Sequence, residues 1–231
     1  MINQLISRSL GISCILVFAL LGAPRSSAII IANWDHPTKD LAPTVVDPNV
    51  TATSQSLVPQ DQVNLSSTTA IYTNINGNAG EIWFCGWDYN GAPNAGQYYE
   101  VTITPNAGYE ITFDQIRSNG RRGTFAATNL VYAYSLNGFG TQADSPVFTI
   151  PTSNGDMTWN FTDFTTTLPV TFRTYLYNEL NVGDQGDNSR YREQIMEVTG
   201  TVQVVVPEPS AALLLGVSGL VLWWRRSKRM G

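Results

Sequence analysis

Residues 99–114 read YEVTITPNAGYEITFD, two alternating segments on either side of a turn. Apolar residues take every second position on both sides, as the side chains of a half-buried β-strand do. The turn itself, Pro105-Asn106-Ala107-Gly108, has residues that favour tight chain reversal. Ile116 is out of phase with the second segment, so we expect a bulge or the end of the strand near Asp114 and Gln115.

The same period of two continues through the rest of the chain, and no convincing helical period accompanies it. Further strands are expected at Ile29–Asp35, near Val50–Val58, and at Glu81–Asp88, Leu130–Leu136, Val147–Ile150, Met157–Phe161, Val170–Tyr177 and Met196–Val206. Asn137-Gly138 favours a tight hairpin turn. In the last strand one face is predicted to carry Met196, Val198, Val202, Val204 and Val206. About nine or ten short strands predict an all-β fold, a single two-sheet antiparallel sandwich.

The composition changes sharply after this last strand. Pro207 and Pro209 cannot continue a sheet ladder, and residues 211–224 contain no charged side chain. At about 1.5 Å per residue, this apolar run would form a helix of roughly 21 Å, short of the roughly 30 Å of a bilayer core. Trp223 and Trp224 suit the membrane interface, and the long Arg and Lys side chains that follow can snorkel outward from a short span. The chain then ends in a basic cluster, Arg225, Arg226, Lys228 and Arg229.

This tail resembles the PEP-CTERM sorting signal of exported bacterial proteins, in which Val-Pro-Glu-Pro precedes a short hydrophobic helix and an arginine-rich end. The matching motif here is Val206, Pro207, Glu208 and Pro209. The resemblance implies that residues 207–231 are a sorting signal with a transmembrane helix at 211–224. It also implies that a membrane protease of the exosortase type recognises the motif and cuts nearby. A plain C-terminal anchor with a proline linker is the alternative.

The N-terminus has the features of a secretory signal peptide. Arg8 precedes an apolar stretch from Gly11 to Ala23, and Ser26-Ser27-Ala28 supplies small residues for cleavage after Ala28. We therefore expect a signal peptide at 1–28 and a mature domain at 29–206, exported with the help of the export machinery. The protein would be anchored by its C-terminal helix before processing and would then reside at the cell surface or in the extracellular matrix.

The expected mature domain is acidic. Residues 29–206 contain 7 Lys and Arg against 17 Asp and Glu, a net charge of −10 with His36 neutral. This charge argues against nucleic acid and anionic lipid headgroups as partners. Cys14 leaves with the signal peptide, so Cys85 is the one remaining cysteine and the mature domain forms no internal disulfide. Its stability should come from a sheet core.

A second resemblance covers most of the domain and is structural. The segments concerned are 99–105, 108–114, 134–139, 170–173 and the Trp-Asp at 34–35. They resemble those of PEP-CTERM exported proteins with a jelly-roll-like β-sandwich, whose biochemical activity is usually not assigned. The loop at 183–187 departs from that family by being more acidic.

No catalytic motif is evident, so the domain is expected not to be an enzyme and to need no cofactor. His36 is the only imidazole, and a zinc site would need several His or Cys ligands. Glycosidase chemistry requires only two carboxylates, and many are present. A carbohydrate-active hydrolase on the jelly-roll sandwich is therefore the alternative to a structural or carbohydrate-binding role.

Two features are candidate binding sites. Trp83 and Trp87 share one face of the expected strand with Cys85, where they either fill the core or present rings that stack on sugars of an extracellular polysaccharide. Asp184, Asp187 and Asn188 lie in a glycine-rich loop and offer oxygen atoms of the kind calcium binds, although a hairpin turn has the same composition.

Overall fold

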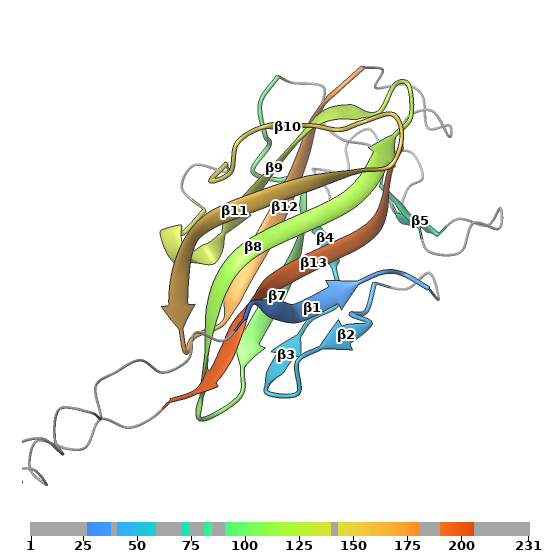
Figure 1. Ribbon diagram of the computed structural model, residues 1–231. Helices are drawn as coiled ribbons and strands as arrows, with labels where there is room; N and C mark the ends of the chain where they lie inside the picture. The colour runs from blue at the N-terminus through green and yellow to red at the C-terminus, as the bar shows by residue number, and fades with distance from the viewer. Residues whose placement is uncertain are drawn as a thin grey trace, which may run out of the picture.

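The computed structural model describes residues 27–37, 41–58, 71–73, 81–84, 91–139, 143–180 and 190–205, with the backbone alone at 71–73, 83 and 84. Figure 1 shows two antiparallel sheets that face each other, which confirms the predicted all-β sandwich. The first sheet contains β11 (Gly155–Thr166), β8 (Tyr109–Arg122), β13 (Tyr191–Val204), β1 (Ile29–Trp34) and β2 (Val45–Val46), with β6 (Ile82–Phe84) and β5 (Ile71–Thr73) beside β13. The second contains β10 (Phe148–Thr149), β9 (Ala127–Tyr134), β12 (Val170–Glu179), β7 (Tyr98–Pro105), β3 (Val50–Ala52) and β4 (Ser56–Val58).

The chain alternates between the two sheets rather than completing one before the other. The first sheet contains the strand order β1-β13-β8-β11, and it faces the second sheet, which contains the order β7-β12-β9-β10. The first and last strands, β1 and β13, are therefore neighbours in the same sheet. This is the strand order of a jelly roll, in which Greek-key connections cross between sheets. Such pairing joins residues that are distant in the chain, because Ile29 lies opposite Gly200.

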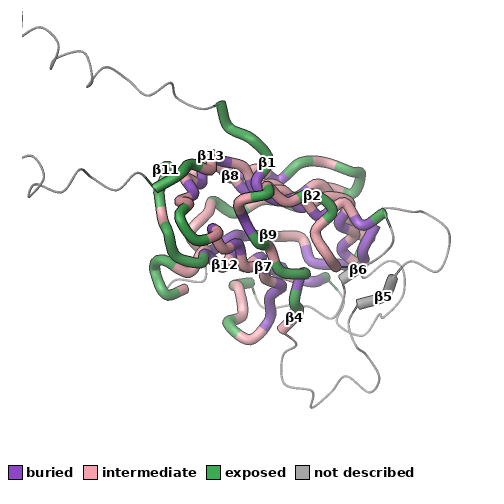
Figure 2. Tube along the Cα trace, turned by 90° about the horizontal axis from the view of Figure 1, so that it is seen from below, coloured by how far each residue is buried: buried purple, intermediate pink, exposed green. Residues whose placement is uncertain are grey.

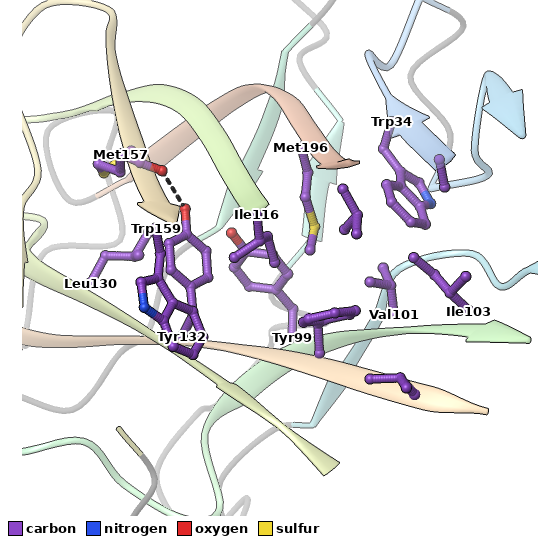
Figure 3. Close-up of a cluster of buried hydrophobic side chains, with 14 of the residues drawn as sticks. Trp34, Tyr99, Val101, Ile103, Ile116, Leu130, Tyr132, Met157, Trp159 and Met196 are labelled. Carbon is purple, nitrogen blue, oxygen red and sulfur yellow. Dashed lines mark hydrogen bonds between the residues drawn. The ribbon is translucent and has the colours of Figure 1, made fainter. Parts of the chain in front are cut away.

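The core lies between the sheets, where Figure 2 shows the buried residues concentrated. Its members come from alternate positions of both sheets, as the period of two predicts, and several are aromatic. Figure 3 shows Tyr132 and Trp159 side by side in this core; their stacked rings have centroids 6.4 Å apart. The Tyr132 hydroxyl donates to the Met157 carbonyl oxygen at 2.8 Å, which satisfies the polar end of a buried ring.

Two sequence-based details of the strands are refined. β8 continues past Asp114 as a bulged strand. Thr199 of β13 lies opposite Gln115 and the next residue, Gly200, lies opposite Phe113, so Asp114 is the extra residue of a bulge. Asn137-Gly138 does not form a two-residue hairpin. Instead it closes the short 3-10 helix η2 (Ser135–Asn137), with Gly138 left-handed at φ 71°.

The last strand also differs from its prediction. Met196 and Val198 are buried as expected, but Val204 is 60% exposed, so it does not share their environment. The alternation itself continues, because Met196, Val198 and Gly200 are buried and Val202 packs against the core. β13 then extends beyond the core, and Val204 lies at the end of the sandwich.

The sandwich has two distinct ends. β1 begins and β13 ends at one of them, which we call the tail end, because these strands are antiparallel neighbours (Figure 1). β8 ends and β13 begins at the other, which we call the arginine end. In the part of the chain that the structure describes, no helix has the length and apolar character needed to cross a membrane. The signal peptide, the sorting motif Val206–Pro209 and the tail lie outside the described residues.

Candidate functional site

Basic residues are concentrated at the arginine end. Of the 7 Lys and Arg in residues 29–206, four are at this end, Arg121, Arg122, Arg190 and Arg192. The antiparallel register brings them together, because Arg121 is the partner of Arg192 and Arg122 is the partner of Tyr191. The Gly123 amide also donates to the Arg190 carbonyl oxygen at 2.9 Å. An acidic domain therefore has a local basic cluster.

The guanidinium of Arg122 is held in place by backbone carbonyl groups. Its Nε donates to the Ile150 carbonyl oxygen at 3.1 Å. Its Nη1 donates to the carbonyl oxygens of Gly123 and Thr124, each at 3.2 Å. A guanidinium has five N–H donors, and these three bonds use none of the pair on Nη2. Among the described residues no carboxylate forms an ion pair with Arg122, so a fixed positive charge is available for an anionic ligand.

The other two arginines of β8, Arg117 and Arg121, are paired with carboxylates. Arg121 Nη2 lies 3.0 Å from Glu81 Oε1, which also accepts a bond from Gln194 Nε2 at 3.2 Å. Arg117, nearer the middle of β8, lies 3.4 Å from both Asp156 and Glu197. Two arginines placed directly opposite each other on neighbouring strands repel. The carboxylate of Glu81 compensates the charge of Arg121 and so reduces the repulsion between Arg121 and Arg192.

Gly120 permits this close approach of β8 to β13. A Cβ atom at this position would lie 2.6 Å from the Arg192 carbonyl oxygen and 2.8 Å from the Tyr191 hydroxyl oxygen. Both distances are shorter than side-chain atoms tolerate, and the first involves backbone that cannot rotate away. Only glycine therefore fits at position 120. Its missing side chain lets the backbone of β8 approach the backbone of β13 at Arg192.

Exposed apolar side chains border the arginine cluster. Phe125 is 36% exposed and follows Thr124, whose carbonyl oxygen accepts a bond from Arg122. Leu180 is 57% exposed at the end of β12, and its amide donates to the Phe125 carbonyl oxygen at 3.0 Å. An exposed aromatic ring beside a guanidinium can stack on the apolar face of a sugar while the guanidinium binds a carboxylate.

Directly behind this end, a buried polar cluster joins the two sheets. Glu193 accepts hydrogen bonds from Tyr99 Oη at 2.5 Å and Gln55 Nε2 at 2.6 Å, and His36 Nε2 lies 3.6 Å from its carboxylate. Burial, reinforced by the charge of Glu193, raises the pKa of Tyr99 well above its ordinary value, and the same causes raise the pKa of Tyr191. His36 and Glu193 are fully buried. The one imidazole of the chain is therefore part of the core and contacts no surface ligand.

The remaining described arginine, Arg173, lies on the outer face of the second sheet. Its guanidinium carbon is 4.0 Å from the ring centre of Tyr98 and 3.8 Å from that of Phe139, and its Nε donates to Glu100 at 2.9 Å. Desolvation is the largest single effect on Arg173 and lowers its pKa. Hydrogen bonds to Glu100 and Tyr175 act in the opposite direction and outweigh it, so the pKa of Arg173 is raised. Enclosed by rings and paired with a carboxylate, Arg173 is a structural contact.

The sequence-predicted site residues are only partly placed. Trp83 lies on β6 as the backbone partner of Arg192, so the strand that carries it borders the arginine end. Trp87, Cys85, Asp184, Asp187 and Asn188 lie outside the described residues. Within the described ranges no three His, Cys, Asp or Glu side chains are grouped closely enough to hold a metal ion. Sequence reasoning missed Arg122; the available signal was the Arg121-Arg122 pair between Gly120 and Gly123 in an acidic domain.

Comparisons with known proteins add little to this geometry. No protein-family model matches the chain, and no curated protein matches it. A solved structure that contains the CBM32-1, CBM32-2 and M60 catalytic domains of Clostridium perfringens ZmpB is similar over 77% of this chain and 17% of that chain. The identity is 12% and the TM-score is 0.28.

Proposed function

We propose that this protein is an exported component of the cell envelope or extracellular matrix whose arginine end binds an acidic polysaccharide. One observation carries the proposal. Arg122 is fixed by three backbone carbonyl groups and has no carboxylate partner among the described residues. In a domain of net charge −10, such a cation stands out as a site for an anionic group.

The chemistry of the site fits a polymer of uronic acids. Arginine binds carboxylates through two parallel N–H donors, a geometry that lysine does not offer. Phe125 supplies an exposed ring for the apolar face of a pyranose next to that carboxylate. The acidic residues elsewhere in the domain act weakly at this site, because charges are screened beyond about 8 Å at physiological ionic strength.

The cellular location in this proposal is supported by the sequence of both ends. Residues 1–28 have the n-region, apolar stretch and small residues of a signal peptide. Residues 206–231 have the three parts of a PEP-CTERM signal in the correct order, so an exosortase-type protease is the proposed processing partner. A binding module that reaches the cell surface would meet the polysaccharides secreted there.

Binding to polygalacturonate, a uronic acid polymer, tests the proposal, with neutral dextran as the reference polymer. The full-length protein, kept in mild detergent, should bind polygalacturonate and not dextran. Arg122→Gln should weaken binding at least about tenfold, the loss of roughly 1.4 kcal/mol that one charge-assisted contact supplies. Arg117→Gln is the matched control, because Arg117 is already paired with Asp156 and Glu197.

A second variant separates loss of binding from loss of folding. Phe125→Ala removes a ring that is only 36% exposed, so its thermal melt measures the packing that is lost. Its affinity for polygalacturonate, measured well below both melting temperatures, should fall. Unchanged affinity in both Arg122→Gln and Phe125→Ala would refute this site. Release of reducing sugar from polygalacturonate by the pure protein would show instead that it is a hydrolase.

A further inference from the structure

The tail end of the sandwich exposes apolar side chains from two distant parts of the chain. Leu168 is 65% exposed in the turn between β11 and β12, while Val204 and Val205 are 60% and 36% exposed after the core part of β13. Thr166 and Val202 are both backbone partners of Ile111, so these segments flank the same part of β8. Large apolar side chains are thus gathered at one end of the domain.

This apolar end carries little charge. Residues 105–110, 166–170 and 202–205 at this end contain one charged residue, Glu110, which accepts a bond from Gln203 at 2.6 Å. The adjoining turn at 47–49, which is hydrogen-bonded to Asn106, adds Asp47. Leu168 is held in position because its amide donates to Thr166 Oγ1 at 2.9 Å. The adjoining Pro169 restricts the turn further. The exposed leucine is therefore presented on a fixed turn.

The chain that continues from this end reaches an apolar run quickly. Five residues, 206–210, separate Val205 from the uncharged stretch 211–224. At no more than about 3.3–3.6 Å per residue, the step from Val205 to Ala211 covers at most roughly 20 Å. If residues 211–224 insert into a bilayer, the tail end must lie close to its surface.

We infer that the tail end rests on the outer surface of the bilayer, with Leu168 and Val204 in contact with the interfacial region. Apolar side chains gain free energy by leaving water for this region, whereas Glu110 and Glu208 disfavour anionic headgroups. The favoured surface is therefore zwitterionic lipid. The inference rests on the proposed anchoring by residues 211–224 before processing and adds the orientation of the domain in that anchored form.

This orientation separates the two ends by the length of the sandwich. β8 begins at the tail end, and the last of its 14 residues is Arg122. At about 3.3 Å per residue, the arginine end lies roughly 45 Å from the membrane surface. The proposed polysaccharide site would then face outward, away from the lipid.

Depth-dependent fluorescence quenching tests the orientation. The full-length protein, with Cys14→Ser and Cys85→Ser, is labelled with an environment-sensitive fluorophore at Leu168→Cys and placed in phosphatidylcholine vesicles containing lipids spin-labelled near the headgroup. Ser153→Cys, an exposed position at the arginine end, is the matched control. We expect at least a threefold greater quenching at 168 than at 153. A thermal melt confirms that both labelled proteins are folded.

Flotation of the vesicles separates anchoring from orientation. Protein that floats with the vesicles but is quenched equally at both positions would overturn the orientation and leave the anchoring intact. Protein that fails to float would overturn both the anchoring and the orientation. Neither result affects the polygalacturonate assay, because that assay contains no membrane.

Discussion

Tyr99 of β7 and Glu193 of β13 connect the two sheets through a hydrogen bond of 2.5 Å between the phenol and Oε2 of the carboxylate. Both side chains are fully buried. A buried carboxylate is costly unless its oxygens accept hydrogen bonds, and here Gln55 supplies the second donor. The contact thus satisfies a buried carboxyl group within the polar cluster that joins the two sheets.

Tyr99→Phe should destabilise the domain by about 2 kcal/mol, because it leaves the buried Glu193 oxygen without its donor. Urea unfolding followed by circular dichroism measures the change. Tyr134→Phe is the control, since Tyr134 is half-buried and no hydrogen bond to its hydroxyl is seen within the described part of the chain. Equal stability of the two variants would show that Glu193 does not depend on Tyr99.

Alkaline pH should destabilise the fold through its buried tyrosines. Burial is the largest cause that raises the pKa of Tyr99, Tyr132 and Tyr191 above the ordinary value of 10.0. Because the folded pKa is raised, the stabilisation is complete below about pH 10 and is lost as the pH rises above it. Absorbance at 295 nm during a pH titration should show these three phenols ionising together with unfolding. Early ionisation of all ten tyrosines in folded protein would contradict this burial.

Gly120→Ala should destabilise the domain by about 1–3 kcal/mol through overpacking, because the added Cβ atom meets the Arg192 carbonyl oxygen at 2.6 Å. Gly91→Ala is the matched control, as a Cβ atom there meets no atom within 4 Å. Its unfolding free energy should stay within about 0.5 kcal/mol of the wild type. Thermal and urea unfolding compare the two, and a neutral Gly120→Ala would show that β8 and β13 are less tightly packed.

Processing at both ends is expected in a host that has the sorting protease. If both terminal segments are cleaved as their motifs predict, the mature protein should begin near Ile29 and lack residues 211–231. Intact-mass measurement of protein recovered from that host decides the matter. If the tail remains on the mature protein there, the C-terminus is an ordinary anchor. Replacement of Glu208 by Ala should retain the tail if the motif is read as proposed.

The sequence alone was sufficient for the fold class and for the two strands and the turn at 99–114, although not for the placement of these strands in opposite sheets. Alternation of polar and apolar residues is local, and it reports directly that one face of a strand is buried. It also located the irregularity near Asp114 and Gln115, because an extra residue shifts the alternation, and the structure shows it to be a bulge rather than the end of the strand. The exported nature of the chain and its sorting tail stay predictions from sequence motifs.

The tertiary structure decided which strands are neighbours, and with them the candidate site. Arg121 and Arg192 are 71 positions apart in the chain, and only the pairing of β8 with β13 places them opposite each other. The burial of His36 against Glu193 likewise depends on β1 and β13 being adjacent. Val204 is exposed because β13 outruns the core, which alternation cannot reveal. Period-two patterns define faces, whereas partners and strand ends depend on long-range packing between sheets.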